Sequence, residues 1–169
     1  MQRLVIITLL AWLASLGFDL LLHGGLLAGY YVAENDPFLL SPQQAFARIP
    51  LGYASFALLT AMLVWLMYRL NVKRILPGAR FGLILGVLLW GSSALGLYSI
   101  TTAKPGLLVG WFIGQSIELA IAGAVVGAGL NGRSLWKIAG VVAVIIIICL
   151  AFTIVMQSLG LAPALHVTT

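Results

Sequence analysis

Ionisable side chains are scarce in this chain. Only 8% of its 169 residues are charged, and just four of them are acidic. A soluble domain of ordinary composition has about 25% charged residues. The mean hydropathy of this chain is +1.13. These values exclude a typical water-soluble protein and indicate an integral membrane protein.

The chain also has few of the residues that enzymes and metal centres need. Its single cysteine, Cys149, excludes an internal disulfide, a CxxC redox pair and a thiolate metal cluster. Its two histidines, His23 and His166, lie too far apart to pair as haem ligands within a membrane. A GxSxG elbow, a phosphate-binding loop and an HExxH motif are missing. We therefore disfavour an enzyme, with acid catalysis by Asp19 or Glu118 left open, assign no cofactor and leave a metal undetermined.

The net charge of +5 does not indicate a nucleic-acid partner. The nine Lys and Arg residues are scattered singly at the ends of apolar segments and form no basic stripe interleaved with aromatic side chains. Nucleic acid is therefore excluded as a partner, and the basic residues are interpreted as determinants of membrane topology.

Long apolar runs dominate the chain. Each meets the length of about 20 residues that a helix needs to cross the hydrocarbon core. We predict an all-α polytopic membrane protein, a single bundle of five transmembrane helices that uses the whole chain. The predicted spans are residues 4–32, 50–69, 81–102, 107–130 and 136–161.

The first predicted span is longer than a bilayer requires. It must tilt, project beyond the membrane, or break at Gly24 and Gly25. We expect it to project outward.

The distribution of Lys and Arg predicts the orientation. With a cytoplasmic N-terminus, seven of the nine basic residues fall on the cytoplasmic side and only Arg48 and Lys104 fall outside. The C-terminus is then outside, because the span count is odd. We predict a multi-pass protein of a prokaryotic cytoplasmic membrane. The seven cytoplasmic residues are Arg3, Arg69, Lys73, Arg74, Arg80, Arg133 and Lys137.

The longest connection, the outer loop of residues 33–49, contains a helix signal of its own. Ser41 can cap a helix that Pro42 opens. Apolar residues such as Phe38 and Phe46 would let a short interfacial helix lie on the outer membrane surface. A lid over a cavity between the spans is the alternative.

Two predicted spans carry glycines at steps of four residues. Such rows let helix backbones approach closely in a membrane. They predict a tight contact between the third and fourth spans, or between this pair and a partner protein. The rows are Gly82 with Gly86 in the third span, and Gly110 with Gly114 and Gly123 with Gly127 in the fourth.

A few polar residues fall where only hydrocarbon is expected. Asp19 and Glu118 lie near the midpoints of the first and fourth spans, where a charged acid costs about 2.5 to 3.5 kcal/mol on insertion scales. His23 lies one turn from Asp19, and Gln115 lies one turn from Glu118. If the two spans pack together, these four side chains form one cluster. Ser92 and Ser93 of the third span are expected to complete its hydrogen bonds.

Two functions fit this pattern. The first is a small membrane protein that acts by helix packing, as an accessory subunit of a membrane complex or as a homo-oligomer, with the cluster holding helices in register. The second is a proton- or cation-coupled transporter or channel component that uses Asp19, His23 and Glu118. Both place the protein in a lipid bilayer.

Overall fold

The computed structural model describes residues 1–32 and 38–163, and these residues form helices and turns without a strand. Five helices are long and apolar enough to cross a membrane, which confirms the predicted all-helical class and the five apolar helices. The elements are α1 (Gln2–Leu21), the π-helix η1 (Leu22–Leu26), α2 (Ala28–Tyr31), α3 (Pro42–Arg69), α4 (Ile75–Ile100), α5 (Pro105–Leu130) and α6 (Leu135–Ser158).

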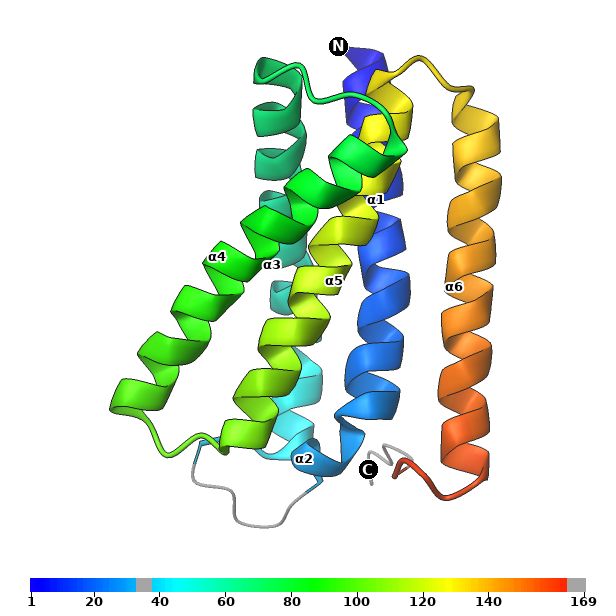
Figure 1. Cartoon of the computed structure of the whole chain (residues 1–169). Helices are drawn as coiled ribbons and strands as arrows, with labels where there is room; N and C mark the ends of the chain where they lie inside the picture. The colour runs from blue at the N-terminus through cyan, green and yellow to red at the C-terminus, as the bar shows by residue number, and fades with distance from the viewer. Residues whose placement is uncertain (33–37, 164–169) are drawn as a thin grey trace.

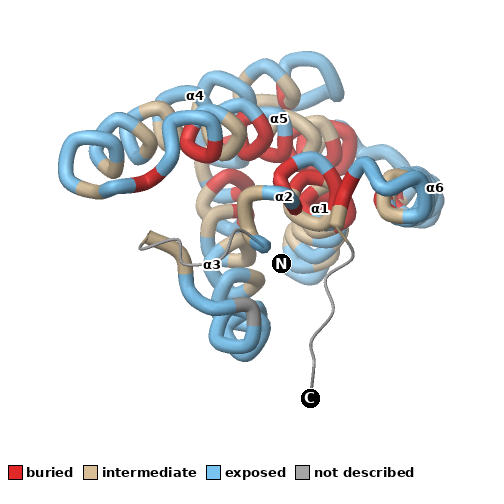
Figure 2. The backbone as a smooth tube through the Cα atoms, turned by 90° about the horizontal axis from the view of Figure 1, so that it is seen from below, coloured by how far each residue is buried: buried red, intermediate tan, exposed pale blue. Residues whose placement is uncertain are grey.

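Helices α1 and α5 form the centre of the bundle. α1 contacts α3, α5 and α6, while α4 packs almost entirely on α5. Figure 1 shows α4 crossing α5 obliquely, so that the two helices diverge toward the end of α4. Buried residues concentrate on α1 and α5 in Figure 2, whereas most of α4 and α6 is exposed. The core is therefore built around the two helices that carry the predicted polar cluster.

The contact between α4 and α5 is made by backbone against backbone. A Cβ on Gly82 would overlap the carbonyl oxygen of Leu119, and one on Gly123 would overlap that of Gly78. Only glycine permits this approach, because any side chain at these positions would collide with main-chain atoms of the other helix. The glycines in this seam are Gly78, Gly82 and Gly86 of α4 and Gly123 and Gly127 of α5.

The other predicted glycine row faces a different neighbour. A Cβ on Gly110 would meet the side chain of Leu27, and one on Gly114 would meet that of Leu22. These two glycines therefore bring α5 close to the end of the first span, not to α4. One helix uses its two glycine rows for two separate contacts within the chain.

The first span does not project outward as a straight helix. Its α-helical part ends at Leu21 and widens into η1, where the amide of Leu27 donates to the carbonyl of Leu22 at 2.8 Å. The change falls at Gly24 and Gly25, the break that the sequence offered as an alternative. A π-turn leaves carbonyls displaced from the regular ladder, and Gln157 of α6 donates to one of them, that of Gly24, at 3.0 Å.

The predicted interfacial helix is not a separate element. Ser41 and Gln44 form a reciprocal capping box, and one uninterrupted helix runs from there to Arg69. Pro50 lies inside this helix. A proline lacks an N–H and so removes one hydrogen bond of the helix, while the neighbouring residues keep theirs. The expected start of the second span at residue 50 was therefore wrong for the helix. Residues 33–37 of the predicted outer loop lie outside the described residues.

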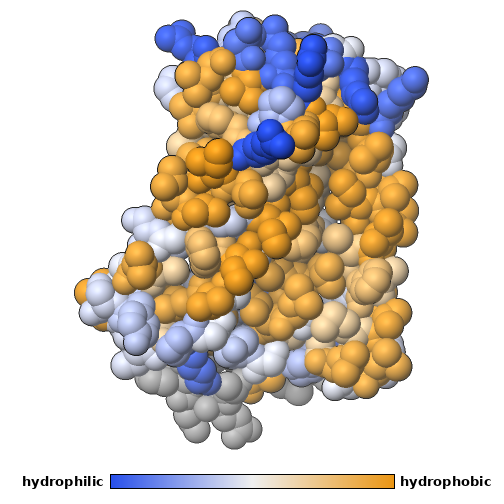
Figure 3. Space-filling model, viewed as in Figure 1, coloured by the Kyte–Doolittle hydropathy of each residue, from blue (hydrophilic) through white to orange (hydrophobic). Residues whose placement is uncertain are grey.

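Polar and apolar side chains are segregated along the bundle axis. Figure 3 shows hydrophilic side chains gathered at one end and an apolar belt along the middle. We call this end, where α1 begins, α3 ends and α5 connects to α6, the basic end. Its residues are Arg3, Arg69, Lys73, Arg74, Arg80, Arg133 and Lys137. α1 begins and α6 ends at opposite ends of the bundle (Figure 1).

Candidate functional site

Four of the six predicted cluster residues come together between the first span and α5. Asp19 and Glu118 are only 7% and 2% exposed, and Gln115 is 3% exposed. His23, in η1, is half-buried beside them. The contact between α1 and α5 that the sequence could only assume is present, so the two polar edges face each other.

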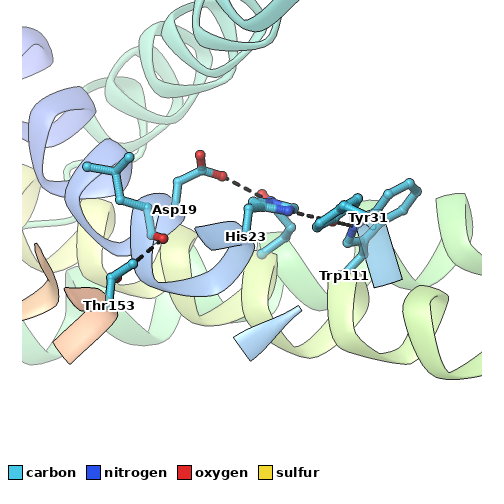
Figure 4. Close-up of polar contacts among 7 residues, drawn as sticks. Asp19, His23, Tyr31, Trp111 and Thr153 are labelled. Atoms are coloured by element: carbon cyan, nitrogen blue, oxygen red, sulfur yellow. Dashed lines mark hydrogen bonds and ion pairs between the residues drawn. The ribbon is translucent and has the colours of Figure 1, made fainter. Parts of the chain in front are cut away.

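His23 is the hub of this cluster. Its Nε2 atom lies 3.2 Å from Oδ1 of Asp19 and 3.1 Å from the side-chain amide of Gln115. Its other ring nitrogen, Nδ1, lies 2.6 Å from the hydroxyl of Tyr31. One imidazole ring therefore connects an acid of α1, an amide of α5 and a phenol of α2. Figure 4 shows Asp19, His23, Tyr31 and Trp111 following one another in a row.

Tyr31 and Trp111 were not predicted as members of the cluster. The indole Nε1 of Trp111 donates to the hydroxyl of Tyr31 at 2.6 Å. Tyr31 lies outside the apolar helix Gln2–Leu26, and burial is the largest cause that raises the pKa of its phenol. The hydroxyl therefore keeps its hydrogen at neutral pH. Tyr and Trp residues near the ends of spans are usually interpreted as anchors at the membrane interface. Their position in the sequence therefore gave no indication that they join the cluster.

The two acids of the cluster lack ordinary hydrogen-bond partners. Oε2 of Glu118 is buried and, within the described part of the chain, has no hydrogen-bond partner. Oδ1 of Asp19 approaches His23 as an ion pair but without hydrogen-bond geometry. The two carboxyl groups are close enough to interact electrostatically. A fully satisfied structural network would leave no such atoms.

Ser92 and Ser93 do not join the cluster. Both are exposed on α4, and the hydroxyl of Ser93 donates to the carbonyl of Leu89 in its own helix at 2.8 Å. The expectation failed because α4 diverges from α5 beyond the glycine seam, so that a Cβ on Gly96 would meet no atom within 4 Å. Both serines lie within the predicted third span, but they do not lie close to the cluster.

The arrangement does not form a recognisable metal centre. Within residues 1–32 and 38–163, no group of three or more His, Cys, Asp or Glu side chains is placed to hold a metal ion. His166 lies outside these residues. The chemistry that the described cluster offers is hydrogen bonding and proton exchange among Asp19, His23, Gln115 and Glu118.

No family model matches the chain, and no curated protein and no solved structure matches it. A function has to be argued from the cluster itself.

Proposed function

We propose that the protein is a multi-pass membrane protein that carries protons or small cations through its bundle, as a transporter or channel component. Asp19, His23 and Glu118 are the ion-handling residues. The lipid bilayer surrounds the five apolar helices, whose length and composition fit a membrane protein.

The observation that carries this proposal is the unpartnered state of the buried carboxyl groups. Leaving a buried polar group without a hydrogen bond costs about 1 to 3 kcal/mol. A cluster that served only to hold helices in register would lower this cost by pairing its oxygens, yet Oδ1 of Asp19 and Oε2 of Glu118 have no hydrogen bond in the described structure. Ionisable residues kept inside a membrane despite such a cost are typical of ion pathways.

The competing function, an accessory subunit or homo-oligomer, loses its main argument. Glycine rows would support it if they faced outward and so offered close contact to a partner helix. In this protein they face other helices of the same chain, in the α4–α5 seam and against Leu22 and Leu27. The apolar faces that stay exposed on α4 and α6 can be covered by lipid.

We further propose that the basic end faces the cytoplasm. Seven of the nine Lys and Arg residues lie there, which is the bias expected for cytoplasmic loops. The start of α1 is then cytoplasmic and the end of α6 is outside. A reporter enzyme that is active only outside the cytoplasm, fused after Thr169, should be active, and an inactive fusion would contradict this orientation.

Ion flux in liposomes tests the proposed function directly. The purified protein should carry protons or alkali cations across a liposome membrane under an imposed electrical potential, above the leak of empty liposomes. Glu118→Gln keeps the size of the side chain but removes its charge. We expect it to reduce the flux about a hundredfold, the order that a positioned proton-transfer group contributes.

The matched control is Glu34→Gln. It makes the same chemical change at an acid that lies between α2 and α3 in the sequence. This variant should retain wild-type flux. The proposed function is wrong if no ion crosses above the leak, or if Glu118→Gln and Asp19→Asn both conduct like the wild type.

A further inference from the structure

The hydroxyl of Tyr31 determines where the hydrogen of His23 resides. An indole nitrogen can only donate, so Oη of Tyr31 accepts from Trp111. The hydroxyl's own hydrogen then points to Nδ1 of His23, 2.6 Å away, and this nitrogen must accept it. A neutral imidazole carries one hydrogen, which is therefore on Nε2.

The opposite tautomer is unfavourable on both sides of the ring. With its hydrogen on Nδ1, His23 would donate to Tyr31, and within the described chain the phenol hydrogen would have no acceptor. The lone pair of Nε2 would also face Oδ1 of Asp19 at 3.2 Å, acceptor against acceptor. A doubly protonated ring still carries a hydrogen on Nε2. An N–H therefore faces Asp19 in each favourable state.

Gln115 fits this assignment if its amide is turned. The oxygen and nitrogen of an amide are alike in shape and are told apart by their partners. An Nε2–H on His23 requires the amide atom at 3.1 Å to be the oxygen. Turning the amide also gives a hydrogen-bond partner to the Gln115 oxygen, which is otherwise buried without one. The Gln115 oxygen then accepts from this N–H, and Oδ1 of Asp19 lies 3.2 Å from the same nitrogen.

From this geometry we infer that the ion taken up by the cluster is the proton and that His23 delivers it to Asp19, with Tyr31 and Trp111 as positioning residues. This inference rests on the proposed function and names its ion. A metal or alkali cation is bound by lone pairs of oxygen or nitrogen ligands. His23 presents an N–H to Asp19, and such a donor repels a cation at that place.

In the central step of the transfer, one N–H bond breaks and one O–H bond forms. A proton arriving from the Tyr31 side adds to Nδ1 while the phenol turns to accept, which makes the ring an imidazolium. The N–H bond at Nε2 then breaks as an O–H bond forms on the carboxylate of Asp19. The ring is left neutral with its hydrogen on Nδ1, Asp19 becomes a neutral carboxylic acid, and one proton has moved from the ring to the acid.

Nitrogen NMR on a His166→Ala parent chain tests the tautomer without any functional assay. The chain has only two histidines, so a His166→Ala variant labelled at histidine reports on His23 alone. The signals distinguish a ring nitrogen that carries hydrogen from one that does not. We expect hydrogen on Nε2 and a bare Nδ1, and Tyr31→Phe should give a mixture of tautomers. A neutral ring with hydrogen on Nδ1 in the parent would overturn the inference.

Ion selectivity in liposomes provides the second test. At equal driving force, proton flux should exceed sodium and potassium flux at least about tenfold, and His23→Gln should lower it about a hundredfold. A flux carried by sodium or potassium would overturn this inference and leave the proposed function standing. The absence of any flux would overturn the proposed function and this inference with it, while the NMR result would still report the tautomer.

Discussion

Two faces of α5 make contacts of opposite character. The face toward α4 is a seam of glycines in which main-chain atoms touch main-chain atoms. The face toward α1 carries Gln115, whose amide meets His23, and Glu118, whose buried Oε2 has no hydrogen-bond partner in the described structure. The closest approaches of the first contact are between main-chain atoms, which cannot adjust. The second consists of side chains whose hydrogens can move.

The difference separates stability from function within one helix. The most apolar stretches of α5 and α4 have similar mean hydropathies, 1.6 and 1.8. Yet 50% of the residues in the α5 stretch are buried, against 6% of those in the α4 stretch. α4 therefore packs on the bundle mainly through its seam with α5, and most of its remaining surface is exposed. The cluster, by contrast, retains buried carboxyl oxygens without a hydrogen bond, where a purely structural contact would favour apolar side chains.

The largest effect is expected from filling the seam. In Gly82→Leu the new side chain would overlap the carbonyl of Leu119, so the helices must separate. We expect the free energy of unfolding to fall by about 3 kcal/mol, the upper range for overpacking a close contact. Unfolding in mixed detergent micelles, followed by circular dichroism, measures this change.

Gly96→Leu is the matched control for the seam. It lies on the same helix, and a Cβ there meets no atom within 4 Å. Its effect should stay within about 1 kcal/mol and be stabilising, since a mid-helix glycine is unfavourable. Equal losses for both variants would show that α4 and α5 do not meet through their glycines.

A smaller effect, of opposite sign, is expected at the cluster. Glu118→Met replaces a buried, unpartnered carboxyl with an apolar side chain of similar length. We expect the free energy of unfolding to rise by about 1 to 2 kcal/mol, because an unsatisfied buried polar group is removed. Ion flux in liposomes should be lost in the same variant.

The control for this variant is Leu119→Met, a volume-conserving change at the adjacent buried position. Leu119→Met should lower the free energy of unfolding by less than about 1.5 kcal/mol, and the variant should retain ion flux in liposomes. A Glu118→Met protein less stable than the wild type would mean that the carboxyl group is a structural partner, and the contrast between the two faces of α5 would disappear.

The smallest effect concerns the π-helix that positions His23. Gln157→Leu removes the side chain that donates to the carbonyl of Gly24. We expect a loss of about 1 kcal/mol in unfolding free energy, the value of one ordinary hydrogen bond. Ser158→Ala is the control, because that hydroxyl only donates to the carbonyl of Ile154 in its own helix. If both variants match the wild type, η1 does not depend on α6.

Helices were the most predictable feature, and their ends the least. Long apolar runs indicated all five spanning helices, because hydropathy over about 20 residues is a strong signal. Pro50 did not end α3, since the helix tolerates one missing bond when the rest of the ladder is intact. Gly24 and Gly25 did mark a change in the first span, but spacing did not show that it is a π-helix or that Gln157 of α6 donates to the Gly24 carbonyl.

The cluster was predictable only as far as spacing along a single helix reveals it. Spacing along one helix paired Asp19 with His23 and Gln115 with Glu118, because residues three or four apart share a helix face. The link to Tyr31 crosses η1 and a turn, so no helical spacing could reveal it. Ser92 has the right depth but lies on a helix that has already turned away.

By itself, the sequence determined which segments are helical, how deep each polar residue lies along its helix, and which end of the bundle is basic. Only the tertiary structure decided which helix each glycine row meets, that His23 reaches both Asp19 and Tyr31, and that the serines of α4 stay outside. Hydropathy and spacing are properties of one helix along its own axis. Contact between helices depends on their rotation and tilt about that axis, which close packing across the whole bundle sets.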